Sequence, residues 1–97
     1  MTNHYKLFYN EYINKIKRKE GLDMEEEYKE FGEFLRNMRL SLDWQPKVMG
    51  EALGVHRTTL ARWEKGEKLV NRDIYELELQ IRDIVKKEIQ KRKQLVG

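Results

Sequence analysis

The sequence predicts an all-α protein, and three observations support this prediction. The 97-residue chain contains one Pro and six Gly, so long stretches carry no helix breaker. Apolar side chains recur at spacings of three and four, which places them on one face of a helix. The breakers that do occur, at Gly21, within 43–46, at Gly54 and at Gly66, divide the chain into five helical segments.

The first two helices are expected over residues 4–19 and about 24–42. Basic residues crowd the end of the first, where cations suit the helix dipole, and Gly21 would be its C-cap. Asp23 and Glu26 have the spacing of a capping box that opens the second. The apolar face of the first helix is Leu7, Phe8, Tyr12, Ile13 and Ile16. The apolar face of the second is Tyr28, Phe31, Leu35, Met38 and Leu42.

Two short helices and one long helix follow. Pro46 suits the first position of a helix over 46–53, because its missing N–H would be unpaired there anyway. Gly54 ends this helix, and a second short helix over about 57–65 ends at Gly66. A long amphipathic helix with a basic tail is expected from Asn71 to about Leu95.

Composition argues against an enzyme. The chain has no Cys, which excludes disulfides, thiolate catalysis and Cys-ligated metal sites. The two histidines, His4 and His56, lie far apart in the sequence, and we find no Ser/His/Asp set and no phosphate-binding loop. We therefore expect no catalytic residues, no cofactor and no metal. Charged residues make up 38% of the chain and the net charge is +3, which permits nucleic-acid binding.

The N-terminal residues show no targeting signal. They contain no apolar core and no small-residue cleavage site. No apolar run in the chain approaches the roughly 20 residues that a membrane helix needs. We therefore expect a cytoplasmic protein with no membrane partner.

Residues 46–66 carry the most informative pattern. Two short helices joined by a tight glycine turn must cross steeply. Gly50 is small where the second helix would press on the first, and Gly54 can take the left-handed conformation that ends a helix. An apolar inner surface is expected from Met49, Leu53, Val55, Leu60 and Trp63.

The outward face of the second short helix is basic and free of acidic residues. It comprises Arg57, Thr58, Ala61, Arg62 and Lys65. Such a face suits the major groove of DNA, where Arg reads guanine and the Thr methyl can meet thymine. Arg57, Thr58 and Arg62 are therefore candidates for base contacts; the alternative is a basic face that contacts only phosphate. The flanking candidates for phosphate contacts are Lys47, Lys65, Lys68 and Arg72. Thr59 is either a further phosphate contact or partly buried beside Trp63.

This segment resembles the helix-turn-helix of the lambda-repressor-like (Cro/Xre-type) DNA-binding domains. Members of that family share a pattern of Leu-Ala, then Leu-Gly-Val-Ser, then Ile-Ser, and finally Glu-x-Gly. The corresponding places here are Met49-Gly50, Leu53-Gly54-Val55-His56, Leu60-Ala61 and Glu64-Lys65-Gly66. Residues 31–39 resemble the family's first helix, so the likeness covers about 31–72. It implies a helix-turn-helix core over 24–70. The chain departs from the family on both sides of this core: residues 1–23, expected as an N-terminal helical extension, lie outside the pattern, and one long helix over 71–97, expected as a dimerisation element, replaces the family's fourth and fifth short helices.

The resemblance also implies particular roles for residues. An Arg late in the family's first helix often pairs with the Glu of Glu-x-Gly, which implies a structural ion pair between Arg39 and Glu64; two separate, solvated side chains are the alternative. Pro46 stands where the family has a phosphate-contacting Gln, so Gln45 or Lys47 would replace that contact. His56 stands where Ser or Thr usually caps the recognition helix. It is either a phosphate contact or a tolerated turn residue.

The terminal helices leave two interpretations open. Ile74, Leu77, Ile81 and Ile84 have heptad-like spacing and could form a dimer interface. Alternatively this stripe packs within the chain against the N-terminal helix, and both arrangements can hold together. A single domain of this kind covers only half of a symmetric site, which favours a homodimer. The N-terminal helix is also a candidate site for a protein partner.

The resemblance implies a sequence-specific, double-stranded-DNA-binding transcriptional regulator. The favoured form is a dimeric repressor of phage or mobile-element type that binds an inverted-repeat operator. One alternative is a DNA-packaging or assembly protein similar to a small terminase subunit, which joins a helix-turn-helix to an oligomerising helix. Another is a protein-interaction module built on the same scaffold.

Overall fold

The computed structural model describes residues 4–18 and 23–96, and these fold into five helices with no strand among them. The helices are α1 (His4–Arg18), α2 (Met24–Ser41), α3 (Pro46–Leu53), α4 (Arg57–Glu64) and α5 (Ile74–Val96). The prediction of an all-α fold is therefore confirmed. The predicted cap at Gly21 lies outside the described residues.

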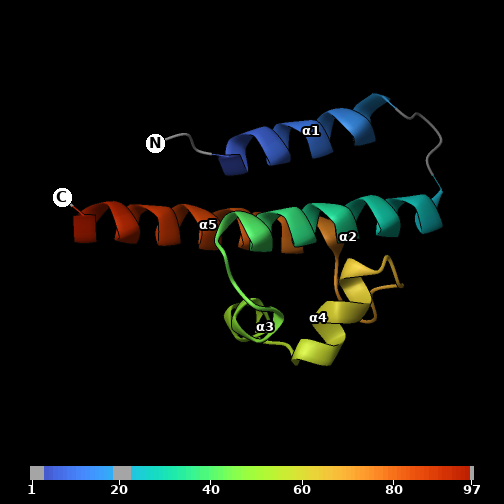
Figure 1. Cartoon of the computed structure of the whole chain (residues 1–97). Coiled ribbons are helices and arrows are strands. Elements are labelled where there is room, and N and C mark those ends of the chain that lie inside the picture. The colour runs from blue at the N-terminus through green and yellow to red at the C-terminus, as the bar shows by residue number, and fades with distance from the viewer. Residues whose placement is uncertain (1–3, 19–22, 97) are drawn as a thin grey trace.

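The helices form layers around α2 (Figure 1). Helix α1 lies on one side of α2 and α5, and the α3–α4 pair lies on the other. Helix α2 packs against α1, α4 and α5, and α3 packs against α4 and α5. Because α2 has neighbours on both sides, its buried surface is wider than one stripe. Phe34, which falls outside the stripe predicted from spacing, is buried together with Phe31, Leu35 and Met38.

Both ends of α2 follow local rules. The Asp23 carboxylate accepts the backbone N–H of Glu26 at 2.8 Å, which confirms the predicted N-cap. The helix ends where Asp43 takes a left-handed conformation with φ of 60°. Arg92 of α5 donates from Nη2 to the carbonyl oxygen of Leu42 at 2.6 Å, which ties the far half of α5 to this end of α2.

Helix α1 packs through most of its predicted face, with Phe8 and Ile13 half-buried against the core beside the tyrosines. Leu7 is 55% exposed, so its placement in the apolar contact is wrong. Tyr12 is buried and stacks on Phe34 with ring centroids 4.4 Å apart, and Tyr9 meets the same ring edge-on at 5.9 Å. Leu7 precedes Tyr12 by five residues, which places it on a different side of the helix from this aromatic contact. The Ile16 side chain lies outside what the structure describes.

Helix α5 begins three residues later than its predicted start. Asn71 has a left-handed φ of 59°, which is incompatible with a continuous helix there. Asp73 then opens the helix: its carboxylate accepts the N–H of Tyr75 at 3.3 Å and its carbonyl accepts that of Leu77 at 3.0 Å. The helix continues to Val96, one residue beyond the predicted end.

The stripe on α5 is buried within the single chain. Leu77, Ile81 and Val85 are fully buried, and Ile74 and Ile84 are half-buried against the same core. Since α5 packs on α2 and α3, Leu77 and Ile81 have no surface left for a second copy. Their assignment to a dimer interface is corrected accordingly: the stripe packs intramolecularly, and on α2 and α3 more than on α1.

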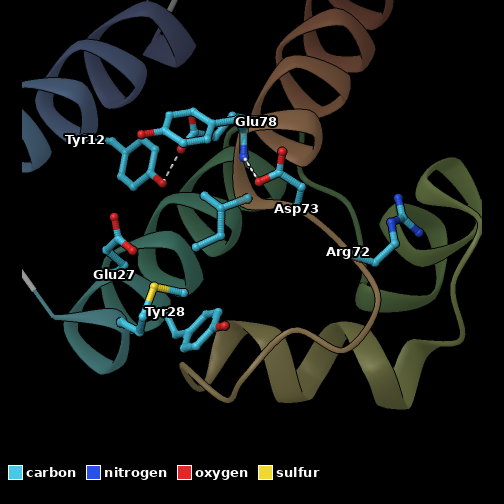
Figure 2. A pocket seen from close by; sticks show the side chains of 9 residues that line it. Tyr12, Glu27, Tyr28, Arg72, Asp73 and Glu78 are labelled. Carbon is cyan, nitrogen blue, oxygen red and sulfur yellow. Dashed lines mark hydrogen bonds between the residues drawn. The ribbon is translucent and has the colours of Figure 1, made fainter.

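One buried polar contact joins α1 to α5. Tyr12 donates its hydroxyl hydrogen to Oε1 of Glu78, which is only 5% exposed (Figure 2). Burial raises the pKa of Glu78 above its ordinary value of 4.5; the Tyr12 hydrogen bond lowers it, and the nearby Asp73 and Glu27 raise it further. Burial and the same carboxylate also raise the pKa of Tyr12, so its hydroxyl stays protonated and remains the donor.

This pair predicts a specific dependence of stability on pH. A carboxyl whose pKa is raised by folding costs nothing below its unfolded pKa and destabilises the fold as pH rises through its folded pKa. Replacing Glu78 by glutamine keeps an acceptor for Tyr12 and removes the charge. The variant Glu78→Gln should therefore gain stability relative to the parent chain between pH 4 and pH 7. Urea unfolding of both proteins at the two pH values measures this.

The matched control is Glu76→Gln, which removes an exposed carboxylate from the same helix. The difference in unfolding free energy between Glu76→Gln and the parent chain should change little with pH. If the stability difference between Glu78→Gln and the parent chain is the same at pH 4 and pH 7, the raised pKa of Glu78 is contradicted.

Candidate nucleic-acid interface

The turn between α3 and α4 depends on two glycines. Gly54 adopts a left-handed φ of 77° and ends α3, as predicted. The N–H of Val55 then donates to the carbonyl oxygen of Gly50 at 2.8 Å. A Cβ on Gly50 would lie only 2.8 Å from the carbonyl oxygen of Val55, so a larger residue there would push the turn away from α3. These glycines set the steep crossing of α3 and α4.

The inner surface of this pair is apolar, as the sequence predicts. Met49, Leu53, Leu60 and Trp63 are buried, and Val55 is half-buried against them. Trp63 is therefore a core residue, and Trp44 is half-buried at the core edge. With its inner side held in this way, α4 has one side left for a partner.

Gly32 controls how closely α4 approaches α2. A Cβ at this position would lie 2.4 Å from the carbonyl oxygen of Trp63 and 3.0 Å from that of Glu64. The end of α4 thus rests directly on the α2 backbone. Sequence reasoning missed this role, although a glycine inside a helix is a signal for close packing because it lowers helix propensity.

The structure brings Arg39 and Glu64 together in a two-pronged ion pair. Arg39 donates from Nε to Oε2 of Glu64 at 2.7 Å and from Nη2 to Oε1 at 3.0 Å. Its Nη1 donates to the carbonyl oxygen of Trp44 at 2.9 Å. The two side chains are 12% and 10% exposed. One guanidinium therefore joins α2, the 42–45 connection and the end of α4.

The three candidates for base contacts lie on the outer side of α4. Arg57, Thr58 and Arg62 are exposed, as is Lys65 one turn further on. Within the described part of the chain, neither Arg57 nor Arg62 forms an ion pair. Ala61 lies between these arginines in the sequence and is half-buried, so the middle of this face carries only a short side chain. An exposed helix face with two unpaired guanidinium groups can donate to base edges or phosphates.

His56 caps α4 with its ring. Nδ1 accepts the N–H of Thr58 at 3.1 Å and lies 3.0 Å from Oγ1 of the same residue. Because Nδ1 acts as an acceptor, the neutral ring carries its hydrogen on Nε2, which is left as a donor. A histidine thus takes the capping place that Ser or Thr usually fills, and it keeps one N–H for another partner.

The candidates for phosphate contacts differ in exposure and in whether their side chains already have a partner. Lys47, Lys65 and Lys68 are exposed, and Gln45 precedes α3 without using its side chain as a cap. Arg72 is already engaged: its Nη2 donates to Oε1 of Gln80 at 3.0 Å, and its guanidinium lies 5.8 Å from the centre of the Trp63 ring. Thr59 is half-buried beside the core.

The described residues contain no group of three or more His, Asp or Glu side chains placed to hold a metal ion. None of the described helices carries an apolar stretch long enough to span a membrane.

Comparison with known proteins identifies the family. A family profile described as a helix-turn-helix domain matches residues 30–79, just over half of the chain. The chain therefore belongs to this family of helix-turn-helix DNA-binding domains, as its Cro/Xre-like pattern predicts. Searches of curated proteins and of solved structures return no match.

The close contact at Gly32 gives a testable prediction. Gly→Ala inside a helix gains about 1 kcal/mol of helix propensity, whereas overpacking costs about 1–3 kcal/mol. Because the added methyl would meet backbone atoms rather than a movable side chain, the cost should win. We expect Gly32→Ala to lower the free energy of unfolding, measured by urea denaturation followed by circular dichroism.

Arg36→Ala, at an exposed position of the same helix, is the control and should change stability little. If Gly32→Ala proves as stable as the parent chain, α4 does not rest on the α2 backbone as described.

Proposed function

We propose that this protein is a sequence-specific regulator of transcription, a dimeric repressor of phage or mobile-element type that binds an inverted-repeat operator. The observation that carries the proposal is the exposed face of α4, where Arg57 and Arg62 have no ion-pair partner among the described residues. This face stands on a helix whose opposite side is fixed to α2. It is a cytoplasmic binding protein rather than an enzyme.

In this proposal α4 enters the major groove. The guanidinium groups of Arg57 and Arg62 donate to the acceptor edge of guanine, and the methyl group of Thr58 meets thymine. The Thr58 hydroxyl lies beside Nδ1 of His56, which favours a methyl contact over a hydrogen bond to a base. The discrimination then comes from α4 alone.

Phosphate contacts would hold α4 in register. Lys47 and Gln45 at the start of α3 replace the usual side chain of the family. Lys65 and Lys68 follow the groove contact at the other end of α4, the half-buried Thr59 lies within α4, and Nε2–H of His56 is a further donor. Arg72 would have to leave Gln80 to join them. A repressor of this kind acts by occupying a promoter and excluding polymerase.

The dimer cannot rest on Leu77 and Ile81, because both are buried in one chain. Tyr75 and Leu79 are 68% and 62% exposed and lie one turn apart on the outer side of α5. We therefore place the homodimer contact on this outer side. Two α4 helices would then read half-sites related by two-fold symmetry.

The direct test is selection of bound duplexes from a random pool, at about physiological salt where nonspecific affinity is low. An enriched inverted repeat, with a dimer mass by light scattering, is the expected result. Enrichment of no sequence by the folded protein would overturn the proposal. A ring of many subunits would instead favour a DNA-packaging protein.

The roles of the two arginines can be separated by substitution. Arg57→Ala and Arg62→Ala should each weaken binding to the selected duplex by about 1–3 kcal/mol and relax preference at one base pair. Random DNA should lose much less affinity. Fluorescence anisotropy with both duplexes measures the difference.

Lys87→Ala is the charge-matched control, since this exposed lysine on α5 pairs with Asp83. It should leave the preference unchanged. Equal losses on selected and random DNA would reduce Arg57 and Arg62 to phosphate contacts.

A further inference from the structure

A second cationic site lies at the seam between α1 and α5. A cavity of about 260 Å³ is lined by Lys6, Tyr9 and Asn10 of α1 and by Arg82 and Lys86 of α5. Lys6 and Asn10 are four residues apart, as are Arg82 and Lys86, so each pair lies on one face of its helix. The two faces meet across the seam. None of these residues is part of the candidate nucleic-acid interface.

No acidic side chain among the described residues balances the charges in this cavity. Three cationic side chains line it and no acidic side chain does. Within the residues that the structure describes, Lys6, Arg82 and Lys86 form no ion pair. The neighbouring Asp83 is bound to Lys87 at 2.9 Å. Gathering like charges without a counter-charge is unfavourable, and a bound anion would offset it.

One of the cations is held in place. The guanidinium of Arg82 lies 5.0 Å from the centre of the Tyr9 ring, in a cation–π contact. Tyr9 is itself fixed by its edge-on contact with Phe34 in the core. A donor fixed before the ligand arrives loses less freedom on binding than a mobile one. Arg82 is thus the preorganised centre of the cavity.

We propose that this cavity binds a small ligand through a phosphate group. Guanidinium and ammonium groups make charge-assisted hydrogen bonds to phosphate oxygens, and the Asn10 amide adds a neutral donor. The volume is below that of a typical pocket for a whole organic ligand, so the phosphate enters and the remainder projects outward. The bound phosphate would bridge Lys6 to Arg82 and Lys86 and so fasten α1 to α5.

This site is separate from the proposed DNA interface. Helix α1 lies on the opposite side of α2 and α5 from α4 (Figure 1). The inference therefore does not rest on the proposed function, and pyrophosphate binding can be measured without DNA.

The test is isothermal titration of the full chain with inorganic pyrophosphate at constant ionic strength. We expect saturable binding with one site per chain. Lys86→Gln and Lys6→Gln should each weaken it roughly tenfold, as expected for loss of one charge-assisted hydrogen bond. Lys87→Gln, one residue away but paired with Asp83, should weaken it less than twofold. Pyrophosphate should also slow hydrogen exchange of the amides in α1.

Three results would overturn the proposal. The first is no saturable binding by the folded protein. The second is an equal loss in Lys86→Gln and Lys87→Gln, which would show diffuse attraction of anions. The third is pyrophosphate binding that leaves α1 exchange unchanged while Lys6→Gln and Lys86→Gln weaken DNA binding, which would assign these cations to the nucleic-acid interface.

Discussion

The arrangement of the DNA-facing surface depends on the close approach of α2 and α4. At Gly32 the backbones meet with no room for a side chain. Arg39 then clamps the end of α4 through Glu64 and holds the 42–45 connection through Trp44. Gly32 sets the distance between α2 and α4, and the Arg39–Glu64 ion pair sets the orientation of α4. These contacts occupy the inner side of α4 and fix its orientation. The arginines on its outer side are therefore held at a fixed position relative to α2.

The parts of this structure that are set locally could be predicted from the sequence. The left-handed Gly54, the Asp23 cap and the first-turn Pro46 each act within a few residues, so the bounds of α2, α3 and α4 follow closely. The ion pair between Arg39 and Glu64 is predicted by the family resemblance and not by spacing. The contacts that were missed join distant segments. Tyr12 and Glu78 are 66 residues apart, and nothing in either helix alone marks them as partners. The stripe of α5 was found, but periodicity cannot say whether its partner is α2 or a second copy.

Helix α5 contributes to the core and to two surfaces, which are the cationic seam with α1 and the outer side that carries Tyr75 and Leu79. Its inner stripe completes the core under α2 and α3. Just before its first residue, Arg72 lies over the Trp63 ring and Asp73 lies near enough to Glu78 to raise the pKa of that carboxyl. On its other sides it carries the cationic seam with α1 and the exposed Tyr75 and Leu79. One helix therefore contributes to the fold, to the anion site we propose and to the dimer contact we propose. A ligand that fastens α1 to α5 would act on the same helix that would join two copies.

The central claim is that α4 reads the major groove through Arg57 and Arg62. Methylation protection of guanine N7 on the selected duplex tests this most directly, because N7 lies in the major groove and is an acceptor for arginine. Protected guanines are expected in each half-site, with protection at one guanine lost in Arg57→Ala and at another in Arg62→Ala. Undiminished methylation of every guanine in the fully bound duplex would contradict it.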